Sequence, residues 1–144
     1  MTATSYDRWQ YTSAPSSASV LAGAAMRDVT PPVGIYARAW GAAKHDVADG
    51  VHRPLEVHTL ALQGLDGGPL MLFISLDAGW FRERSAEWEI RKAVIDAVGT
   101  EDANVFFNLS HTHAGSMLSP CYAEKPGGHH VIRYLATLKD AIVE

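Results

Sequence analysis

One short segment limits the fold more than any other part of the chain: the run Leu70–Leu76 (LMLFISL), which is apolar at almost every position. Successive side chains of a strand point to opposite faces, so such a run is apolar on both faces. Strands of this kind are typical of the centre of a sheet that is covered on both sides. We therefore expect a layered fold with this run as a central strand.

A helix and a second apolar strand are expected directly after this run. Ser85 is suited to the N-cap of the helix and Gly99 to its end. The apolar residues between them that share one helical face are Ile90, Val94, Ala97 and Val98. Asn104–Leu109 (NVFFNL) is the next buried strand. The order strand, helix, strand predicts a right-handed crossover between parallel neighbours, and so an α/β fold with a layered mixed sheet.

Two further strands are expected before the crossover. Val57–Gln63 (VHTLALQ) and the central run flank a glycine-rich turn, which is typical of a hairpin. Leu21–Val29 (LAGAAMRDV) predicts an earlier strand, ended by the Thr30–Gly34 segment (TPPVG). Residues 37–50 then form a long irregular stretch, and a loop of that length in a compact domain is more often functional or anchored than idle.

The chain divides into a flexible leader over residues 1–19 and one domain over residues 20–144. The leader ends in Ser13–Ser19 (SAPSSAS), whose small polar side chains bury too little area to offset the entropy lost on ordering. At the other end, Val131–Glu144 has helical spacing at Ile132, Leu135, Leu138 and Ile142, yet no cap, glycine or proline follows it. We therefore expect an incomplete catalytic domain, of which this is the amino-terminal part.

Composition excludes several classes of protein. The 144 residues include 12 basic and 16 acidic side chains, with a net charge of -4 and no run of Lys or Arg, which argues against a nucleic-acid partner. A single cysteine, Cys121, rules out an internal disulfide framework. No apolar stretch is long enough to cross a bilayer, and Met1–Val20 lacks the features of a secretion signal. The expected location is therefore cytoplasmic.

The strongest chemical feature is the histidine pair His111 and His113. Alternate residues of an extended segment point the same way, so two imidazoles at this spacing can approach one metal ion. The pair directly follows a predicted strand and is flanked by small residues, which leaves room for a ligand. Two parallel strands end side by side, so ligands are expected at the loops after them, 77–79 and 110–115. A hydrogen-bonded loop pair remains the alternative interpretation.

Three other residues are candidates for the same site. Asp77 ends the central strand, where a carboxylate can orient a ligating imidazole, although capping of the loop is an equal alternative. His52 and Arg53 lie just before the hairpin, and Arg53 is suited to an anionic group unless the pair simply lies on the surface. Trp40 and Trp80 are interpreted as core or rim residues rather than substrate contacts.

Other nucleophile schemes have less support in the sequence. The chain contains no Gly-x-Ser-x-Gly elbow, phosphate-binding loop or His-Glu-x-x-His helix. Ser110 and Ser116 lie near the histidines, which keeps a metal-independent serine hydrolase as an alternative. It predicts inhibition by serine-directed acylating agents and indifference to chelators.

Four segments, in order along the chain, resemble the neutral/alkaline non-lysosomal ceramidases. Gly23–Pro32 (GAAMRDVTPP) is similar to that family's opening G-x-x-x-x-D-[IV]-T-x-P strand, and Gly50–Arg53 (GVHR) to its glycine, aliphatic, histidine, arginine segment. Ile74–Gly79 (ISLDAG) resembles the strand that ends in Asp-x-Gly. Ser110–Gly115 (SHTHAG) resembles the signature T-H-T-H-S-G-P, with Ala114 in place of serine and Ser116 in place of proline.

The resemblance implies a Zn²⁺-dependent amidohydrolase that cleaves the N-acyl bond of an amide or lipid-like small molecule, such as a ceramide, to a fatty acid and an amine. It implies that His111 is a zinc ligand and that His113 is a catalytic residue that contacts the substrate or the oxyanion. The family's other ligands, a second histidine, a glutamate and a tyrosine, come from later in a longer chain. Here they would come from such a chain or from an oligomer partner. The competing hypothesis is a truncated, catalytically silent domain that lacks those ligands.

Overall fold

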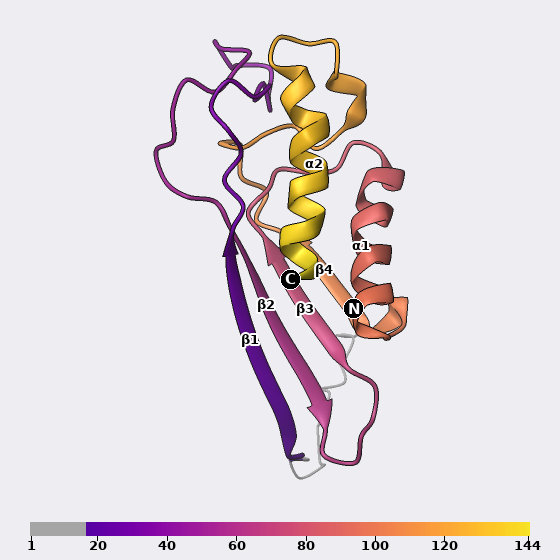
Figure 1. The fold of residues 1–144 in the computed structure, drawn as a ribbon. Helices are drawn as coiled ribbons and strands as arrows, with labels where there is room; N and C mark the ends of the chain where they lie inside the picture. The colour runs from indigo at the N-terminus through magenta and orange to yellow at the C-terminus, as the bar shows by residue number, and fades with distance from the viewer. Residues whose placement is uncertain (1–16) are drawn as a thin grey trace, which may run out of the picture.

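The computed structural model describes residues 17–144. Of the predicted leader, residues 1–16 therefore lie outside the described residues. The elements in chain order are β1 (Val20–Asp28), β2 (Glu56–Gly64), β3 (Met71–Leu76), α1 (Arg84–Val98), η1 (Asp102–Asn104), β4 (Val105–Leu109), η2 (Pro120–Tyr122) and α2 (Gly128–Val143). The fold is α/β, with one mixed sheet and two α-helices in the described part of the chain, as the sequence predicts (Figure 1).

The sheet has four strands in the order β1-β2-β3-β4. β1 pairs antiparallel with β2 along its whole length, from Val20 opposite Gly64 to Asp28 opposite Glu56. The predicted hairpin is confirmed, because β2 pairs antiparallel with β3. Its turn contains Gly67 at φ 79°, a left-handed conformation that suits glycine. The first predicted strand is also confirmed, one residue earlier than the sequence suggested.

The predicted crossover is present as β3, α1 and β4. β3 and β4 are parallel neighbours, with Leu72 opposite Val105 and Leu76 opposite Leu109. Gly99 ends α1 at φ 68° and donates its backbone N–H to the Ile95 carbonyl at 2.9 Å, as expected for a C-terminal glycine.

The predicted N-cap of α1 is wrong. The capping position is Glu83, and Ser85 lies inside the first turn. The Glu83 carboxylate makes no capping hydrogen bond and instead accepts a hydrogen bond from the Ser119 hydroxyl. The last turn also differs from the prediction, since Ile90 and Val94 are buried while Val98 is exposed.

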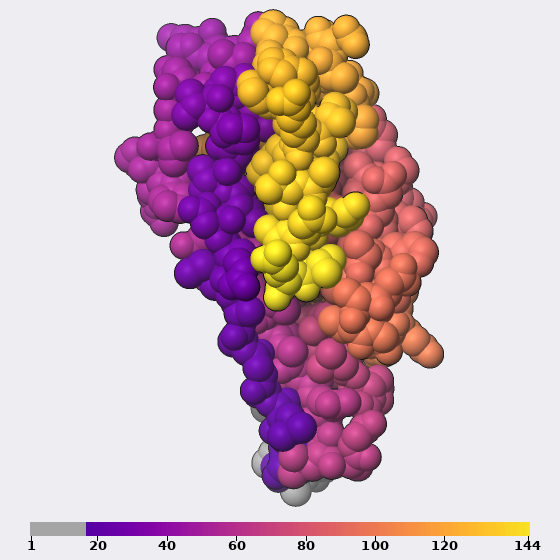
Figure 2. Space-filling model, in the orientation of Figure 1, coloured from indigo at the N-terminus to yellow at the C-terminus, as the bar shows by residue number. Residues whose placement is uncertain are grey.

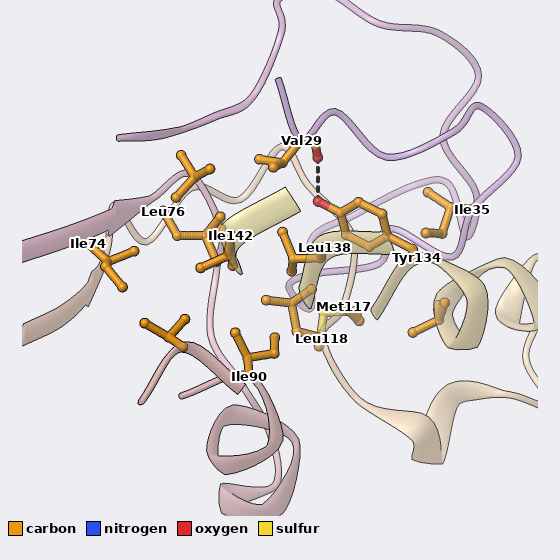
Figure 3. Packing of buried hydrophobic residues seen from close by; sticks show 14 of the residues in the cluster. Val29, Ile35, Ile74, Leu76, Ile90, Met117, Leu118, Tyr134, Leu138 and Ile142 are labelled. Carbon is orange, nitrogen blue, oxygen red and sulfur yellow. Dashed lines mark hydrogen bonds between the residues drawn. The ribbon is translucent and has the colours of Figure 1, made fainter. Parts of the chain in front are cut away.

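The core lies between the sheet and the two helices (Figure 3). α2 contributes Val131, Tyr134, Leu138 and Ile142, all buried. The predicted phase of this helix is therefore partly wrong, because Ile132 is 45% exposed. The helix also begins earlier than predicted, at Gly128, where an added Cβ would lie 1.9 Å from the Tyr122 carbonyl oxygen. Only glycine fits that contact.

Only one face of β3 is covered within residues 17–144, and this corrects the expectation of cover on both sides. Leu72, Ile74 and Leu76 point toward the helices and are 5%, 1% and 0% exposed. Met71 and Phe73 point the other way and are 36% and 37% exposed. Phe73 stacks on Phe106 of β4, with ring centroids 4.8 Å apart and planes at 7°. The open face is thus apolar but exposed.

The loop between β1 and β2 is anchored at both ends. The Val29 N–H donates to the Leu55 carbonyl at 2.8 Å, and the Leu55 N–H donates to the Thr30 hydroxyl at 2.9 Å. Hydrogen bonds from the Thr30 side chain and backbone also lower the pKa of the Asp28 carboxyl. The Asp28–Thr30 segment of the opening motif therefore fixes where this loop leaves the sheet and where it returns.

α2 holds the same loop against the core. The Tyr134 hydroxyl donates to the Val29 carbonyl at 2.5 Å, and burial raises the pKa of Tyr134, so the phenol keeps its proton. The space-filling view shows α2 between the β1 side of the molecule and α1 (Figure 2). Neither α1 nor α2 is long and apolar enough to cross a bilayer, and residues 17–144 contain no other helix that is.

Candidate functional site

The loops that follow β3 and β4 lie in contact. Because the two strands are parallel, both chains leave the sheet at the same edge. The Ser110 N–H donates to the Leu76 carbonyl at 3.0 Å. A Cβ added at Gly79 would lie 3.1 Å from the Thr112 carbonyl oxygen, so the absence of a side chain permits this close approach. The two loops therefore form one surface at the end of the sheet.

His111 and His113 lie together on this surface. Their ring centroids are 5.1 Å apart, with the ring planes at 63°. Both side chains are exposed, and neither makes a side-chain hydrogen bond to another residue in the described range 17–144. The pair can therefore present imidazole nitrogens to a ligand.

The backbone reason given for this pairing needs correction. His111 has φ 59° and is the one non-glycine residue in the described chain with positive φ. The segment is therefore not extended, and the rings do not meet through the alternation of a strand. A left-handed backbone costs a non-glycine residue about 1–2 kcal/mol, so neighbouring contacts must hold this conformation.

Two tryptophans contact the histidines. The Trp80 indole stacks on His111 with centroids 5.5 Å apart and planes at 26°, and lies 5.8 Å from His113 at 62°. Trp40 meets the His113 ring edge-on at 5.9 Å and is 56% exposed. Aromatic pairs of this kind are worth about 0.5–1.5 kcal/mol each beyond the area they bury. Trp40, Trp80, His111 and His113 together form what we call the aromatic cluster.

The sequence interpretation of the two tryptophans missed this cluster. For Trp80 the sequence contains a signal, because this residue directly follows the Asp77–Gly79 loop, which is expected to lie beside the histidine loop. For Trp40 there was none, because its position beside His113 depends on the path of the long loop between β1 and β2. Bonds such as Gly34 N–H to the Ala48 carbonyl at 2.8 Å, and Ala37 N–H to the Asp46 carbonyl at 2.9 Å, set that path.

The other candidate residues meet in a neighbouring pocket of about 310 Å³. His52, Arg53 and Asp77 line it, together with residues of the histidine loop, namely Thr112, Ala114 and Gly115. Arg53 makes no ion pair with any residue in the described part of the chain. The pocket is thus bounded by the histidine loop, while the two imidazoles themselves lie outside its lining.

Asp77 has a structural partner in this pocket. Its carboxylate accepts the Glu56 backbone N–H at 3.3 Å, while its own N–H donates to the Glu56 carbonyl at 2.9 Å. Within residues 17–144, no hydrogen bond joins Asp77 to either histidine of the pair. The Asp77 carboxylate therefore joins β3 to the start of β2, and its predicted role beside an imidazole stays a prediction.

The serines near the histidines are placed differently. Ser116 is buried, and its hydroxyl donates to the Tyr36 carbonyl at 3.3 Å. Ser110 is exposed, and neither serine hydrogen-bonds a histidine in the described range. A serine nucleophile needs a base within hydrogen-bonding reach, so this geometry gives the serine hydrolase alternative no support.

A complete metal site is not formed by the described residues. No group of three or more His, Cys, Asp or Glu side chains in residues 17–144 is arranged to hold a metal ion. Catalytic zinc sites usually take three protein ligands and leave one position open. The donor set of two neighbouring imidazoles thus fits part of such a site.

Comparison with known proteins identifies the fold. No protein-family model matches the chain, and no curated protein does. The solved structures that match include neutral ceramidase from Pseudomonas aeruginosa, with 16% identity and a TM-score of 0.62 over 89% of this chain, and a ceramidase complexed with C2, with 17% identity and a TM-score of 0.59 over 86%. This chain spans only 21% and 20% of their lengths. It therefore has a neutral ceramidase-like fold and corresponds to about a fifth of those proteins.

Proposed function

We propose that this chain is part of a zinc-dependent amidohydrolase that cleaves an N-acyl amide of the ceramide type to a fatty acid and an amine. The observation that carries the proposal is the His111–His113 pair at the end of parallel strands in a ceramidase-like fold. The sequence motifs at the same positions support it independently.

In this proposal the two histidines have different roles. His111 binds the metal through a ring nitrogen, and His113 donates an N–H to the amide oxygen as negative charge develops there. A zinc ion held there would supply a water-derived nucleophile at near-neutral pH, because zinc lowers the pKa of a bound water to about 7. The remaining ligands come from a longer chain or from an oligomer partner, since the described residues contain no third donor beside the pair.

The neighbouring pocket is suited to the polar part of the substrate. Arg53 offers a guanidinium that no described carboxylate occupies, and Thr112 offers a hydroxyl from the histidine loop itself. The Trp40 and Trp80 rings offer apolar surface beside the reacting amide. Such a combination of apolar walls and a few polar groups is typical of sites for small, partly apolar ligands.

The second candidate is a catalytically silent domain, and the incomplete donor set favours it. The two functions differ in one respect that an assay can measure. An amidohydrolase releases fatty acid in a zinc-dependent reaction, whereas the silent domain binds metal weakly and turns over nothing.

The test is zinc binding and N-acyl amide hydrolysis by the wild type, His111→Ala and His58→Ala. His58 is the matched control, because its imidazole is exposed and pairs with Glu56 at 2.9 Å on β2. In the protein that includes the remaining ligands, we expect one zinc per chain in the wild type and in His58→Ala, and none in His111→Ala, with hydrolysis following the zinc. Equal zinc content in all three proteins would contradict the assignment of His111. Zinc without hydrolysis in the wild type would favour the silent domain.

A further inference from the structure

Trp80 is the one side chain of the aromatic cluster that contacts both histidines. Its indole lies 5.5 Å from the His111 ring and 5.8 Å from the His113 ring. We propose that Trp80 is a positioning residue: by stacking on His111 it fixes the plane of that imidazole, and so the direction in which its nitrogens point.

The anchoring of the three residues supports this assignment. Trp80 is half-buried and packs against the hydrophobic core, while His111 and His113 are exposed. The loop that carries Trp80 is held against the histidine loop by the close approach of Gly79 to Thr112 and by the Ser110–Leu76 hydrogen bond. The indole is therefore the fixed partner in the stack, and the imidazole is the ring whose orientation it sets.

The His111 backbone requires such a partner. A residue at φ 59° is held there only by its surroundings, and its side chain makes no hydrogen bond to the described residues. The stack with Trp80 is the parallel aromatic contact that the His111 ring makes, at an interplanar angle of 26°. Loss of the indole face would therefore free both the backbone and the ring of His111.

The orientation of the stacked rings also suits metal binding by His111, an inference that rests on the proposed function. An imidazole binds a metal through a nitrogen lone pair, which lies in the plane of the ring. The indole covers a face of His111 and leaves the ring edge, where the nitrogens lie, open to a ligand. A stack of this kind holds the His111 imidazole in place and leaves its nitrogens free to bind a metal ion.

The experiment compares Trp80→Leu, Trp80→Phe and the control Trp88→Leu by NMR. Trp88 is 43% exposed on α1, and no aromatic contact joins it to the described histidines. Wild type should show cross-peaks between the His111 and His113 rings, and the strong amide-to-α-proton cross-peak of a residue with positive φ. Trp80→Leu should lose both, whereas Trp80→Phe, which restores an aromatic face, and Trp88→Leu should keep both. Unchanged cross-peaks in a folded Trp80→Leu protein would overturn the proposal.

Zinc titration by calorimetry supplies the second readout. We expect Trp80→Leu to weaken zinc binding about tenfold, equivalent to about 1.4 kcal/mol, and Trp80→Phe to recover most of it. If the wild type binds no zinc when the remaining ligands are present, the proposed function fails, and the cross-peaks still decide the role of Trp80. If zinc binds equally in all variants with cross-peaks unchanged, this inference fails and the proposed function stands. Should Trp80→Leu lose helical circular dichroism, Trp80→Met, whose unbranched and flexible apolar side chain adapts to irregular gaps, replaces it.

Discussion

The two faces of β3 carry similar side chains and have opposite surroundings. Ile74 and Leu76, on the helix side, are 1% and 0% exposed, while Phe73 on the other side is 37% exposed. The sequence of the strand is apolar on both sides, so composition does not distinguish the faces. What distinguishes them is the crossover, because α1 and α2 both lie on one side of the sheet. A strand's own residues thus indicate that it is central, but its neighbours decide which face this part of the chain covers.

Truncation of a side chain on the covered face should lower the free energy of unfolding the most. Ile74→Ala removes a side chain that is 1% exposed and surrounded by the core cluster, so the cavity cannot be filled by solvent. We expect the free energy of unfolding to fall by about 3–5 kcal/mol, in the upper part of the range for buried Ile→Ala substitutions. Urea denaturation of the wild type and the variant measures this decrease. A decrease smaller than about 1 kcal/mol would contradict the burial of this face.

Loss of one hydrogen bond on the same side of the sheet should lower the free energy of unfolding by an intermediate amount. Tyr134→Phe keeps the ring but removes the hydroxyl that donates to the Val29 carbonyl at 2.5 Å. A buried carbonyl without its donor costs about 1–3 kcal/mol, and we expect a loss of that size in the free energy of unfolding. The same urea experiment checks it. An unchanged value would mean that the loop after β1 is not held by α2.

Substitution of a side chain on the open face is expected to lower the free energy of unfolding the least. Phe73→Thr keeps a residue suited to strands and removes a ring that is already 37% exposed. Its main loss is the stack on Phe106, worth about 0.5–1.5 kcal/mol, so we expect a decrease of about 1 kcal/mol. Comparison with Ile74→Ala at the next position of the same strand makes the contrast direct. Equal effects of the two substitutions would break the distinction between the faces.

How much the sequence could predict depended on the range of the interaction. The hairpin, the crossover and the end of α1 at Gly99 follow from local patterns, and the structure confirms them. The phase of α2 was partly wrong, since Tyr134 rather than the more apolar Ile132 faces the core. Tyrosine can be buried there because its hydroxyl reaches Val29, a partner that helical spacing does not reveal.

The same limit applies to the candidate site. The sequence singled out His111, His113 and Asp77 from their positions after strands, which is information that lies within a few residues of each. It did not reveal that His111 has a left-handed backbone, or that Trp40 reaches His113 from a distant loop. Both depend on how segments far apart in the chain pack together, and local spacing carries no signal of that packing.

The hydrogen bond between Tyr134 and Val29 joins two residues that the ribosome synthesises at different times. The two residues are separated by 105 positions, so at a synthesis rate of about 5–20 residues per second Tyr134 is made roughly 5–20 s after Val29. The loop that walls the pocket is thus synthesised before the helix that holds it. The pocket beside the histidine loop is lined by residues between Thr30 and Gly115, but the loop that walls it is held by a helix that is synthesised later.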